Sequence, residues 1–597
     1  MTNFLKVYTD LTPSPSRTEF SNVFNGIINA PPFSFDKTSR TELIKAILQD
    51  LKSSGPKEKL TSKDAAQALL AVKTLGKDPS GSAYIASSAH LSTLLGFAAT
   101  FKDDPDASSE ALRCIANALL LIENARSTFI EKEVNGAEIC LTMLEKSTSP
   151  DHVFILSRIL FLATAAGTSH IETILEGKYH GRTVVDILTA KLDLMTIGIR
   201  NGTPTAKEAL TDLLKFVFNL LLHYPKLVDC EPQHSDTHDD EKVMGDYWSS
   251  KLDGLLPPLL RVFLNLPPTS AGPIAAPLTH VIHSLITVPL TPSLKPVWLG
   301  QPASSSSRNS ANNSPKVRTP QLSDSTPASC SDSPTPSNPS SPKASPLDRA
   351  LSVLAAGRRS LSLSRTSSPT TGTPGDVLQR AYDLVESAFS HYFPGTVEPD
   401  DAEVRERAKA ECSDTLDDTL SPIVVLVTRI CIADEASRVR VRQWLIPDDL
   451  DRTSPLEQRS DLLGKCLRLL GSVYHSRLKD SVGEMLFAIA DSNATTLSAL
   501  VGYGNVAGFL FHKGVMSAPV KTTSDTNVPS TTPSGDAINP ITGIKEQPKS
   551  NLPEMDDEEK EREMEKLFVL FDRLEKTGAL PADQNPMRKV IQKSMGG

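Results

Sequence analysis

The sequence has few aromatic residues and no long apolar run. Aromatics make up 5% of the 597 residues, which is lean for a single compact globule. No apolar stretch approaches the roughly 20 residues that a membrane-spanning helix needs. The opening segment, MTNFLKVYTD, lacks a basic region followed by an apolar core. We therefore expect neither a secretory signal nor a transmembrane segment.

Cysteine is also sparse, and its spacing argues against two kinds of framework. The seven cysteines are scattered, odd in number and contain no C-x-x-C pair. That pattern disfavours a disulfide or zinc framework and indicates a reducing compartment. We expect a cytoplasmic protein without a metal or other cofactor. The net charge of −9 gives no overall attraction to nucleic acid, and a basic partner surface is the better match.

What the sequence does contain is helical periodicity. From about residue 40 to 290, apolar residues recur at i, i+3, i+4 and i+7, without clean strand alternation. The most apolar segments begin at Arg113, Ser157 and Lys215, with spacings of 44 and 58 residues. An armadillo or HEAT unit has about 40–47 residues and buries its apolar face against its neighbours. We therefore predict an all-α, armadillo/HEAT-like helical solenoid with a long concave groove.

Two asparagines lie in the middle of predicted inner helices, where asparagine has poor helix propensity. They are Asn117 in IANALL and Asn219 in VFNLLL. One interpretation is that their side chains hydrogen-bond the backbone of a ligand in the groove. The other is that they bond a neighbouring loop carbonyl of the protein itself. The pattern leaves both open.

Composition divides the chain into segments. About half of residues 301–350 are Ser, Thr or Pro, which leaves too little apolar surface to offset the entropy of ordering. Helical patterning resumes at Asp376, and we interpret it as the same solenoid after an insertion in one loop. The predicted organisation is an N-terminal solenoid part over 1–295, a disordered Ser/Pro-rich insert over 296–375, a C-terminal solenoid part over 376–516, a flexible linker with the motif NPITG over 517–553, an amphipathic helix over 554–578 and a tail over 579–597.

The run GYGNVAGFLFHKG, residues 502–514, has the glycine content of a phosphate-binding loop. Such a loop follows a buried strand and opens a helix in a β-α-β unit, whereas the preceding SNATTLSALV is helical in pattern. We therefore predict a turn between two stacked helices. In that turn Asn505 is the N-cap of the second helix, Gly508 allows a close helix approach, and Gly514 ends the helix in the left-handed conformation.

Several segments together resemble the synembryn family. They are LVGYGNVAGFLFHKGVM, the later NPITG with the acidic-to-apolar helix that follows it, and the earlier ALRCIANALLLIENARSTF, LSRILFLAT and LLKFVFNLLL. The resemblance covers most of the patterned chain and fails in the Ser/Pro-rich insert. It implies an armadillo/HEAT-like solenoid that acts in the cytosol on G-protein alpha subunits, as a guanine-nucleotide exchange factor and folding chaperone.

The resemblance also implies how the partner is held. The alpha subunit is GDP-bound or nucleotide-free and without beta-gamma, its C-terminal helix lies in the concave groove, and the C-terminal region of this chain contacts its switch and core elements. We expect a monomer that reaches the cell cortex or plasma membrane through the G protein. The expected partner-binding residues are Arg113, Asn117, Arg126, Arg158 and Asn219 in the groove, Tyr503 and Asn505 in the glycine run, Asn539, Pro540, Thr542 and Gly543 in NPITG, and Met564, Leu567, Phe568, Phe571 and Leu574 in the C-terminal helix.

The chemistry of these residue types suits that role. Arginine pairs with a terminal carboxylate and asparagine with the frayed carbonyls at a helix end. In the C-terminal helix the five apolar residues form one stripe, Asp556 and Glu559 have the capping-box spacing, and Gly578 ends the helix. That stripe docks either on the partner or on the protein's own solenoid.

Regulation and the rival functions rest on weaker patterns. The acidic phosphoacceptor cluster typical of animal members before NPITG is replaced by KTTSDTNVPSTTPSGDA, where Ser524 and Thr526 are candidate acceptors, and Ser362 follows an arginine at the basophilic-kinase spacing. His234 and His238 lie four apart among acids, but in a polar loop that favours solvation over metal binding. The rival to an exchange factor is an armadillo-type scaffold that binds a peptide without affecting nucleotide exchange.

Overall fold

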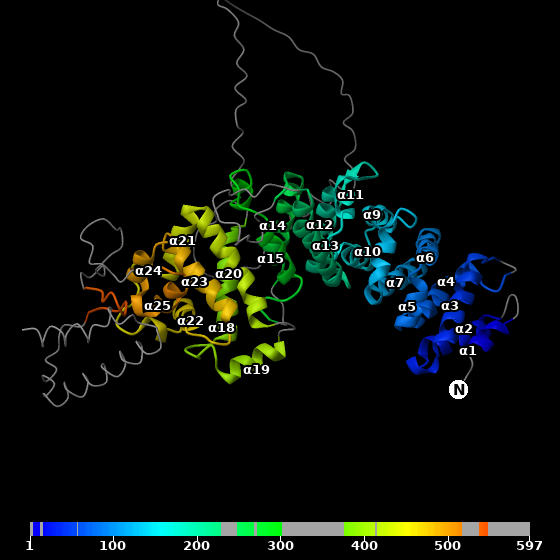
Figure 1. Ribbon diagram of the computed structural model, residues 1–597, viewed down its shortest axis with the longest axis horizontal. Coiled ribbons are helices and arrows are strands. Elements are labelled where there is room, and N and C mark those ends of the chain that lie inside the picture. Colours follow the sequence, from blue (N-terminus) through cyan, green and yellow to red (C-terminus); the bar gives the residue numbers. More distant parts are fainter. Residues whose placement is uncertain are drawn as a thin grey trace, which may run out of the picture.

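The computed structural model describes residues 4–11, 16–55, 58–228, 248–267, 272–300, 375–411, 415–515 and 537–546. In these residues the chain is almost entirely helical and forms an elongated, curved stack (Figure 1). The sheet found there is one short antiparallel pair, β1 (Lys178–Tyr179) and β2 (Arg182–Thr183). The all-α prediction is therefore confirmed.

One row of helices runs the length of the stack, each packed on the next. In order, they are α4 (Ala65–Leu75), α7 (Pro105–Leu121), α10 (Pro150–Thr164), α13 (Ala206–Leu227), α15 (Leu278–Thr287), α20 (Leu416–Ala433) and α23 (Ser476–Ile489). Helices α7, α10, α13 and α15 lie on the inner side of the curve, the lower edge in Figure 1. The three segments whose spacing predicted a repeat are α7, α10 and α13, so the armadillo/HEAT-like solenoid is confirmed.

A second row covers the first. Its members are α3 (Lys37–Lys52), α6 (Ser88–Thr100), α9 (Gly136–Lys146), α12 (Val184–Arg200), α14 (Leu256–Asn265), α18 (Val377–Tyr392) and α22 (Leu462–Leu469). The remaining helices are α1 (Phe4–Thr9), α2 (Arg17–Asn29), α5 (Pro79–Ile85), α8 (Glu123–Ile130), α11 (His170–Glu176), α16 (Lys295–Trp298), α19 (Ala402–Glu411), α21 (Glu435–Leu445), α24 (Ala494–Val501) and α25 (Tyr503–His512), with 3₁₀ turns η1 (Pro32–Ser34), η2 (Ser62–Asp64), η3 (Ser250–Leu255) and η4 (Leu456–Gln458).

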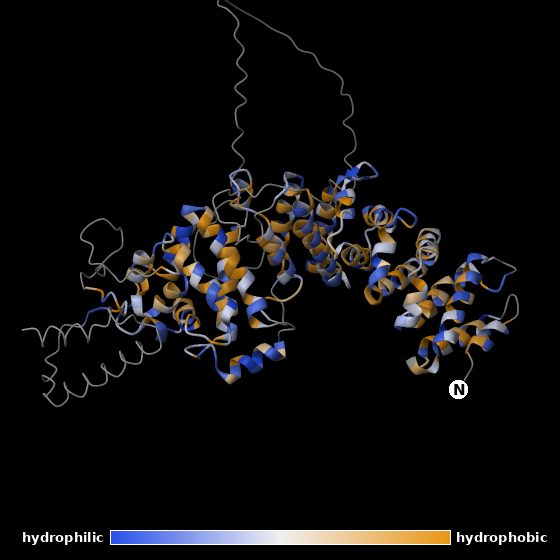
Figure 2. Ribbon diagram, in the orientation of Figure 1, coloured by the Kyte–Doolittle hydropathy of each residue, from blue (hydrophilic) through white to orange (hydrophobic). Residues whose placement is uncertain are grey.

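The inner helices are buried on most sides because two neighbours in the row and one covering helix enclose each of them. Apolar residues accordingly gather between helices, and polar residues lie on the outside (Figure 2). Helix α7 illustrates how the sequence sets the ends. Asp104 accepts a hydrogen bond from the amide of Ala107, and Pro105 occupies the first turn, where no amide donor is needed.

The helices before Gly300 and after Gly375 belong to one stack, and residues 301–374 lie outside the described part of the chain. Helix α15 packs on α20, and α14 packs on α18. Polar contacts join the same two parts, because Lys295 Nζ lies 2.9 Å from Asp434 Oδ1 and Arg380 donates to the carbonyl of Leu266 at 3.0 Å. Helix α16 extends the described solenoid to Gly300, a few residues past the predicted boundary at 295.

The turn at the glycine run differs in part from its prediction. Gly502 has φ +85° and directly precedes α25, so the helix begins at Tyr503. The prediction that Asn505 is the N-cap is wrong, because Asn505 lies inside the first turn and donates to the carbonyl of Val501 at 2.7 Å. Gly508 is not a close approach either, since a Cβ there would meet nothing within 4 Å. The left-handed end at Gly514, with φ +72°, is confirmed.

Candidate functional site

Charged side chains link successive helices of the inner row. The seven residues that we call the inner polar row are Lys73, Glu110, Arg113, Asp151, Arg158, Asp212 and Lys215. At its start Lys73 Nζ lies 2.7 Å from Glu110 Oε2, and Arg113 contacts both Glu110 at 2.5 Å and Asp151 at 2.6 Å. The row therefore connects α4, α7 and α10 through ion pairs.

The second part of the row joins α10 to α13. Arg158 Nε lies 2.7 Å from Asp212 Oδ2, and Lys215 Nζ lies 3.4 Å from Asp212 Oδ1. The side chain of Asp212 is 2% exposed, whereas that of Arg158 is 44% exposed and stacks on the ring of Phe154. The carboxylate is thus held inside the stack, and the guanidinium keeps a surface that another molecule can reach.

The predicted asparagines are engaged within the protein. Asn219 is buried and donates at 3.0 Å to both the carbonyl of Phe161 and the hydroxyl of Thr164. Asn117 donates to the carbonyl of Lys73 at a longer 3.4 Å. These carbonyls lie near the C-terminal ends of α10 and α4, where the helix itself leaves acceptors unpaired. Arg126 likewise donates to the carbonyl of Leu119 at 2.9 Å. Both asparagines thus bond backbone within the protein, as the second interpretation held, but the accepting carbonyls of Phe161 and Lys73 lie in helices and not in a loop.

This contact gives a stability prediction. Asn219→Leu should lower the free energy of unfolding by about 1–2 kcal/mol, because two buried groups of α10 lose their donor. Asn117→Leu is the matched control, and its effect should be smaller since its hydrogen bond is long and half-buried. Thermal or denaturant unfolding of both variants measures the difference. Equal losses would mean that Asn219 does not serve as a cap for α10.

A histidine pair lies on α15, near Lys215 of the inner polar row. The rings of His280 and His283 lie 6.4 Å apart, and His283 also contacts the ring of Phe218. Burial, with the nearby positive charge of Lys215 and the adjacent His283, lowers the pKa of His280 to about 4. His280 is therefore a neutral imidazole at pH 7.

The motif NPITG docks on the glycine run, although the sequence assigned it to a linker. Residues 537–546 form a tight hairpin in which Asn539 organises the turn by accepting from the amides of Ile541 and Thr542. The hairpin carbonyls of Pro540 and Ile541 accept from the amides of Tyr503 at 2.9 Å and Gly504 at 2.7 Å. The free amides at the start of α25 are thus capped by a segment far along the chain. We call residues 500–504 together with 537–546 the C-terminal clasp.

Glycines and one arginine hold the clasp together. A Cβ on Gly502 would lie 2.5 Å from the amide nitrogen of Gly543, so only glycine allows this approach. Arg452 donates to the carbonyl of Gly543 at 2.6 Å and to that of Leu500 at 2.9 Å, and its own carbonyl accepts from the amide of Lys545. Burial lowers the pKa of Arg452 from its ordinary value. The amides of Tyr503 and Gly504, which a phosphate at this helix start would need, already donate to the hairpin.

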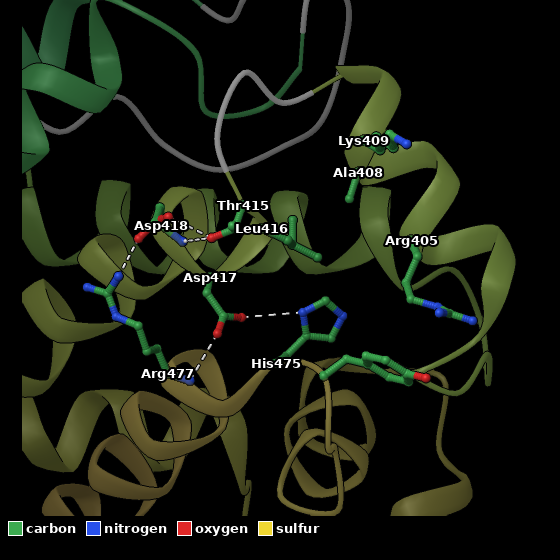
Figure 3. Close-up of a pocket in the computed structure, with 10 residues that line it drawn as sticks. Arg405, Ala408, Lys409, Thr415, Leu416, Asp417, Asp418, His475 and Arg477 are labelled. Carbon is green, nitrogen blue, oxygen red and sulfur yellow. Dashed lines mark hydrogen bonds and ion pairs between the residues drawn. The ribbon is translucent and has the colours of Figure 1, made fainter.

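A hollow of about 780 Å³ lies between α19 and the starts of α20 and α23 (Figure 3). Asp417 accepts from the amide of Arg477 at 2.9 Å and lies 3.3 Å from Nδ1 of His475. Asp418 pairs with the Arg477 side chain, and a hydrogen bond from Thr415 holds the pKa of Asp418 below its ordinary value. These groups are engaged in fixing two helix starts.

Part of the predicted site lies outside the described residues. This applies to the stripe and to all the phosphorylation and metal candidates, namely Met564, Leu567, Phe568, Phe571, Leu574, Ser362, Ser524, Thr526, His234 and His238. Among the residues that the structure does describe, no group of three or more His, Cys, Asp or Glu side chains could hold a metal ion. No helix in that same part of the chain is long and apolar enough to cross a membrane.

Sequence reasoning missed the partners of the predicted residues. Arg113 and Arg158 pair with acids 38 and 54 residues ahead, which lie on the next inner helix in each case. Those separations differ from the repeat spacings of 44 and 58 residues by unequal amounts, so the repeat alone does not locate the acid. Arg452 carried no repeat signal either, because it lies in a loop.

Comparisons with known proteins cover most of the chain. The family model of guanine nucleotide exchange factor synembryn matches residues 68–595. Chaperone Ric-8A of Xenopus tropicalis is 29% identical over 165 residues, which are 27% of this chain and 30% of that protein. Chaperone Ric-8 of Drosophila melanogaster is 25% identical over 181 residues, 29% of this chain and 31% of the relative. The aligned chain thus spans about 30% of these relatives' length.

The chain also resembles solved structures, of which one is an example. It comes from a study of a phosphorylation switch in the interaction between cadherin and beta-catenin. It aligns with 87% of this chain and 77% of its own at 11% identity and a TM-score of 0.38.

Proposed function

The chain belongs to the guanine nucleotide exchange factor synembryn family, and from that premise we propose that it binds G-protein alpha subunits, promotes release of their GDP and assists their folding. The observation that carries the proposal is the extent of the family match, which includes the inner polar row, the C-terminal clasp and the segment beyond it. The chaperone names of the relatives support the folding role.

Exchange of this kind needs no covalent chemistry. A protein that binds the nucleotide-free alpha subunit more tightly than the GDP-bound one weakens GDP binding by the same factor. A shift from 1:99 to 99:1 in favour of the empty state needs about 5.5 kcal/mol of differential binding. A long concave face and a separate C-terminal segment could supply it by contacting two surfaces of the partner. Holding the same empty state is also what a folding chaperone would do.

The inner polar row suits a peptide or helix end as its ligand. Arg158 and Arg113 keep side-chain exposures of 44% and 30%, and each already binds a carboxylate. A terminal carboxylate of the partner could join or replace Asp151, whose side chain is 39% exposed. Asn219 is a weaker candidate than the sequence suggested, because both of its recorded hydrogen bonds lie within the stack. We further propose a cytoplasmic monomer that acts on alpha subunits free of beta-gamma and reaches the cell cortex through the G protein.

The test is GDP release from a purified alpha subunit. The full chain should accelerate release at least about 10-fold, and truncation at Pro519 should abolish the acceleration while leaving binding detectable. A second truncation after Glu546 keeps the clasp and removes 547–597, so it separates a role of the clasp from a role of the following segment. Circular dichroism checks that both truncated chains remain helical. Binding without acceleration by the full chain would instead indicate the scaffold function.

A further inference from the structure

The hollow between α19 and the starts of α20 and α23 contains two cations that, among the described residues, lack a carboxylate partner (Figure 3). Arg405 and Lys409 lie at i and i+4, so they project from the same face of α19. The guanidinium carbon of Arg405 lies 4.5 Å from the ring centroid of Tyr474, another residue of the hollow. Such stacking leaves the N–H groups at the edge of the guanidinium plane, where a carboxylate can accept from them.

The two acids that line the same hollow already have partners. Asp418 forms an ion pair with Arg477 and accepts a hydrogen bond from the hydroxyl of Thr415. Asp417 accepts from the amide of Arg477 at 2.9 Å, and its other oxygen lies 3.3 Å from Nδ1 of His475. Among the described side chains of the hollow, the unpaired charge is therefore positive and belongs to α19. A ligand with carboxylates complements that charge.

The turn between α22 and α23 presents two exposed side chains, of which Tyr474 lines the hollow. Val473 is 81% exposed and Tyr474 is 60% exposed. The turn is held in place by Asp400, which accepts from the hydroxyl of Ser472 at 2.5 Å and from the amide of Val473 at 2.8 Å. Side chains on a turn that is already fixed lose less conformational entropy when a partner covers them. Tyrosine and arginine are also the residue types that most often anchor protein interfaces.

We propose that this hollow and its rim bind an acidic peptide segment of a partner protein. Carboxylates of the peptide pair with the two cations of α19, and an apolar side chain of the peptide enters the hollow against Leu416. The volume of about 780 Å³ lies in the range of natural ligand sites and is large enough for several side chains. We call this surface the α19 surface, and its members are Arg405, Lys409, Leu416, Val473 and Tyr474.

The α19 surface shares no side chain with the inner polar row or the C-terminal clasp. The row lies on α4, α7, α10 and α13, and the clasp consists of residues 500–504 and 537–546. In Figure 1, α19 lies on the lower side of the stack, towards the opposite end from α4 and α7. Binding at the α19 surface therefore goes beyond the proposed function, because it concerns a second protein partner and requires no effect on GDP release.

Fluorescence anisotropy of a labelled peptide tests the proposal with the full chain. The probe consists of repeated Glu-Leu-Glu units, and the same peptide with Gln in place of Glu is its control. The Glu peptide should bind, and the Gln peptide should bind at least about 10-fold more weakly. Higher ionic strength should weaken binding of the Glu peptide, because the charges that pair are exposed to solvent.

Two double variants locate the binding on the protein. Arg405→Glu combined with Lys409→Glu should weaken binding of the Glu peptide at least about 10-fold, because two attractive charges become repulsive. Lys102→Glu combined with Lys132→Glu is the matched control, since it changes the net charge equally at two exposed lysines outside the hollow. This control should bind the probe like the wild type. All four side chains are exposed, so neither variant should unfold the chain.

A third double variant, Val473→Ser with Tyr474→Ser, tests the apolar part and should also weaken binding of the Glu peptide. Four results would overturn the proposal. They are no binding of the Glu peptide to the wild type, equal binding of the Gln peptide, wild-type affinity in either variant of the α19 surface, and tighter binding after removal of residues 547–597. The last result would assign the surface to the chain's own acidic segment. GDP release plays no part in these readings, so they are independent of the exchange assay.

Discussion

Gly502→Ala is expected to open the C-terminal clasp. The new Cβ would lie 2.5 Å from the amide nitrogen of Gly543 and 2.8 Å from the carbonyl oxygen of Ile541, and both atoms belong to backbone that cannot rotate away. The backbone at Gly502 also has φ +85°, which costs an L-residue about 1–2 kcal/mol. We expect a total loss of about 3 kcal/mol or more in the local stability of the clasp.

Hydrogen exchange at the amides of Tyr503 and Gly504 measures this loss, because both donate to the hairpin. Their exchange should accelerate on the order of 100-fold if the clasp opens. Gly514→Ala is the matched control, since Gly514 has φ +72° but nothing within 4 Å of its Cβ position. It carries a positive φ without the collision. Similar exchange at Tyr503 and Gly504 in both variants would show that steric approach does not hold the hairpin.

Stability should fall as the pH is lowered from 6.5 towards 4, and His280 should account for a large share of the loss. The folded pKa of about 4 lies below the ordinary 6.5, so the unfolded chain binds the proton first. The contribution of His280 is therefore complete above pH 6.5 and is lost between 6.5 and 4. The size is on the order of 3 kcal/mol, because one pKa unit corresponds to about 1.4 kcal/mol.

Urea unfolding at a series of pH values measures this dependence. His280→Gln should flatten the curve between pH 6.5 and 4, because the variant has no proton to take up at that position. His512→Gln is the control, because it removes a histidine that is exposed at the end of α25. The groups facing His280 are Lys215 from α13 and His283 from its own helix. A curve for His280→Gln that matches the wild type would contradict the assignment.

The fold was predictable from the sequence because its signal is local and repeated. Each inner helix must be apolar on most sides. Helices α7, α10 and α13 can therefore be recognised in the sequence from their apolar composition alone. The turn at Gly502 was predictable only in outline. Asn505 has the residue type of an N-cap, but the capping groups of α25 come from Pro540 and Ile541, which lie more than thirty residues away. Local sequence propensity cannot predict a cap when the capping groups belong to a segment that is distant in the sequence.

The same limit explains the groove residues. The asparagines in the middle of helices suggested a ligand. Only the structure shows that Asn219 instead donates to the carbonyl of Phe161. Pairs such as Arg158 with Asp212 depend on the register between two helices, and that register depends on an irregular loop between Arg200 and Ala206. The sequence therefore predicted which residues face solvent and which face the core. It did not predict which charged or polar side chains pair with one another.

The junction between the two parts of the stack has a consequence for the integrity of the chain. Helices α14 and α15 meet α18 and α20 through packing, and Lys295 and Arg380 add polar contacts to the same interface. A backbone cut between Gly300 and Gly375 would thus leave two fragments that retain a shared non-covalent surface. The protein could be reassembled from separately made halves. Cleavage at this point would remove the covalent link between the halves but would leave the fold of each half largely unchanged.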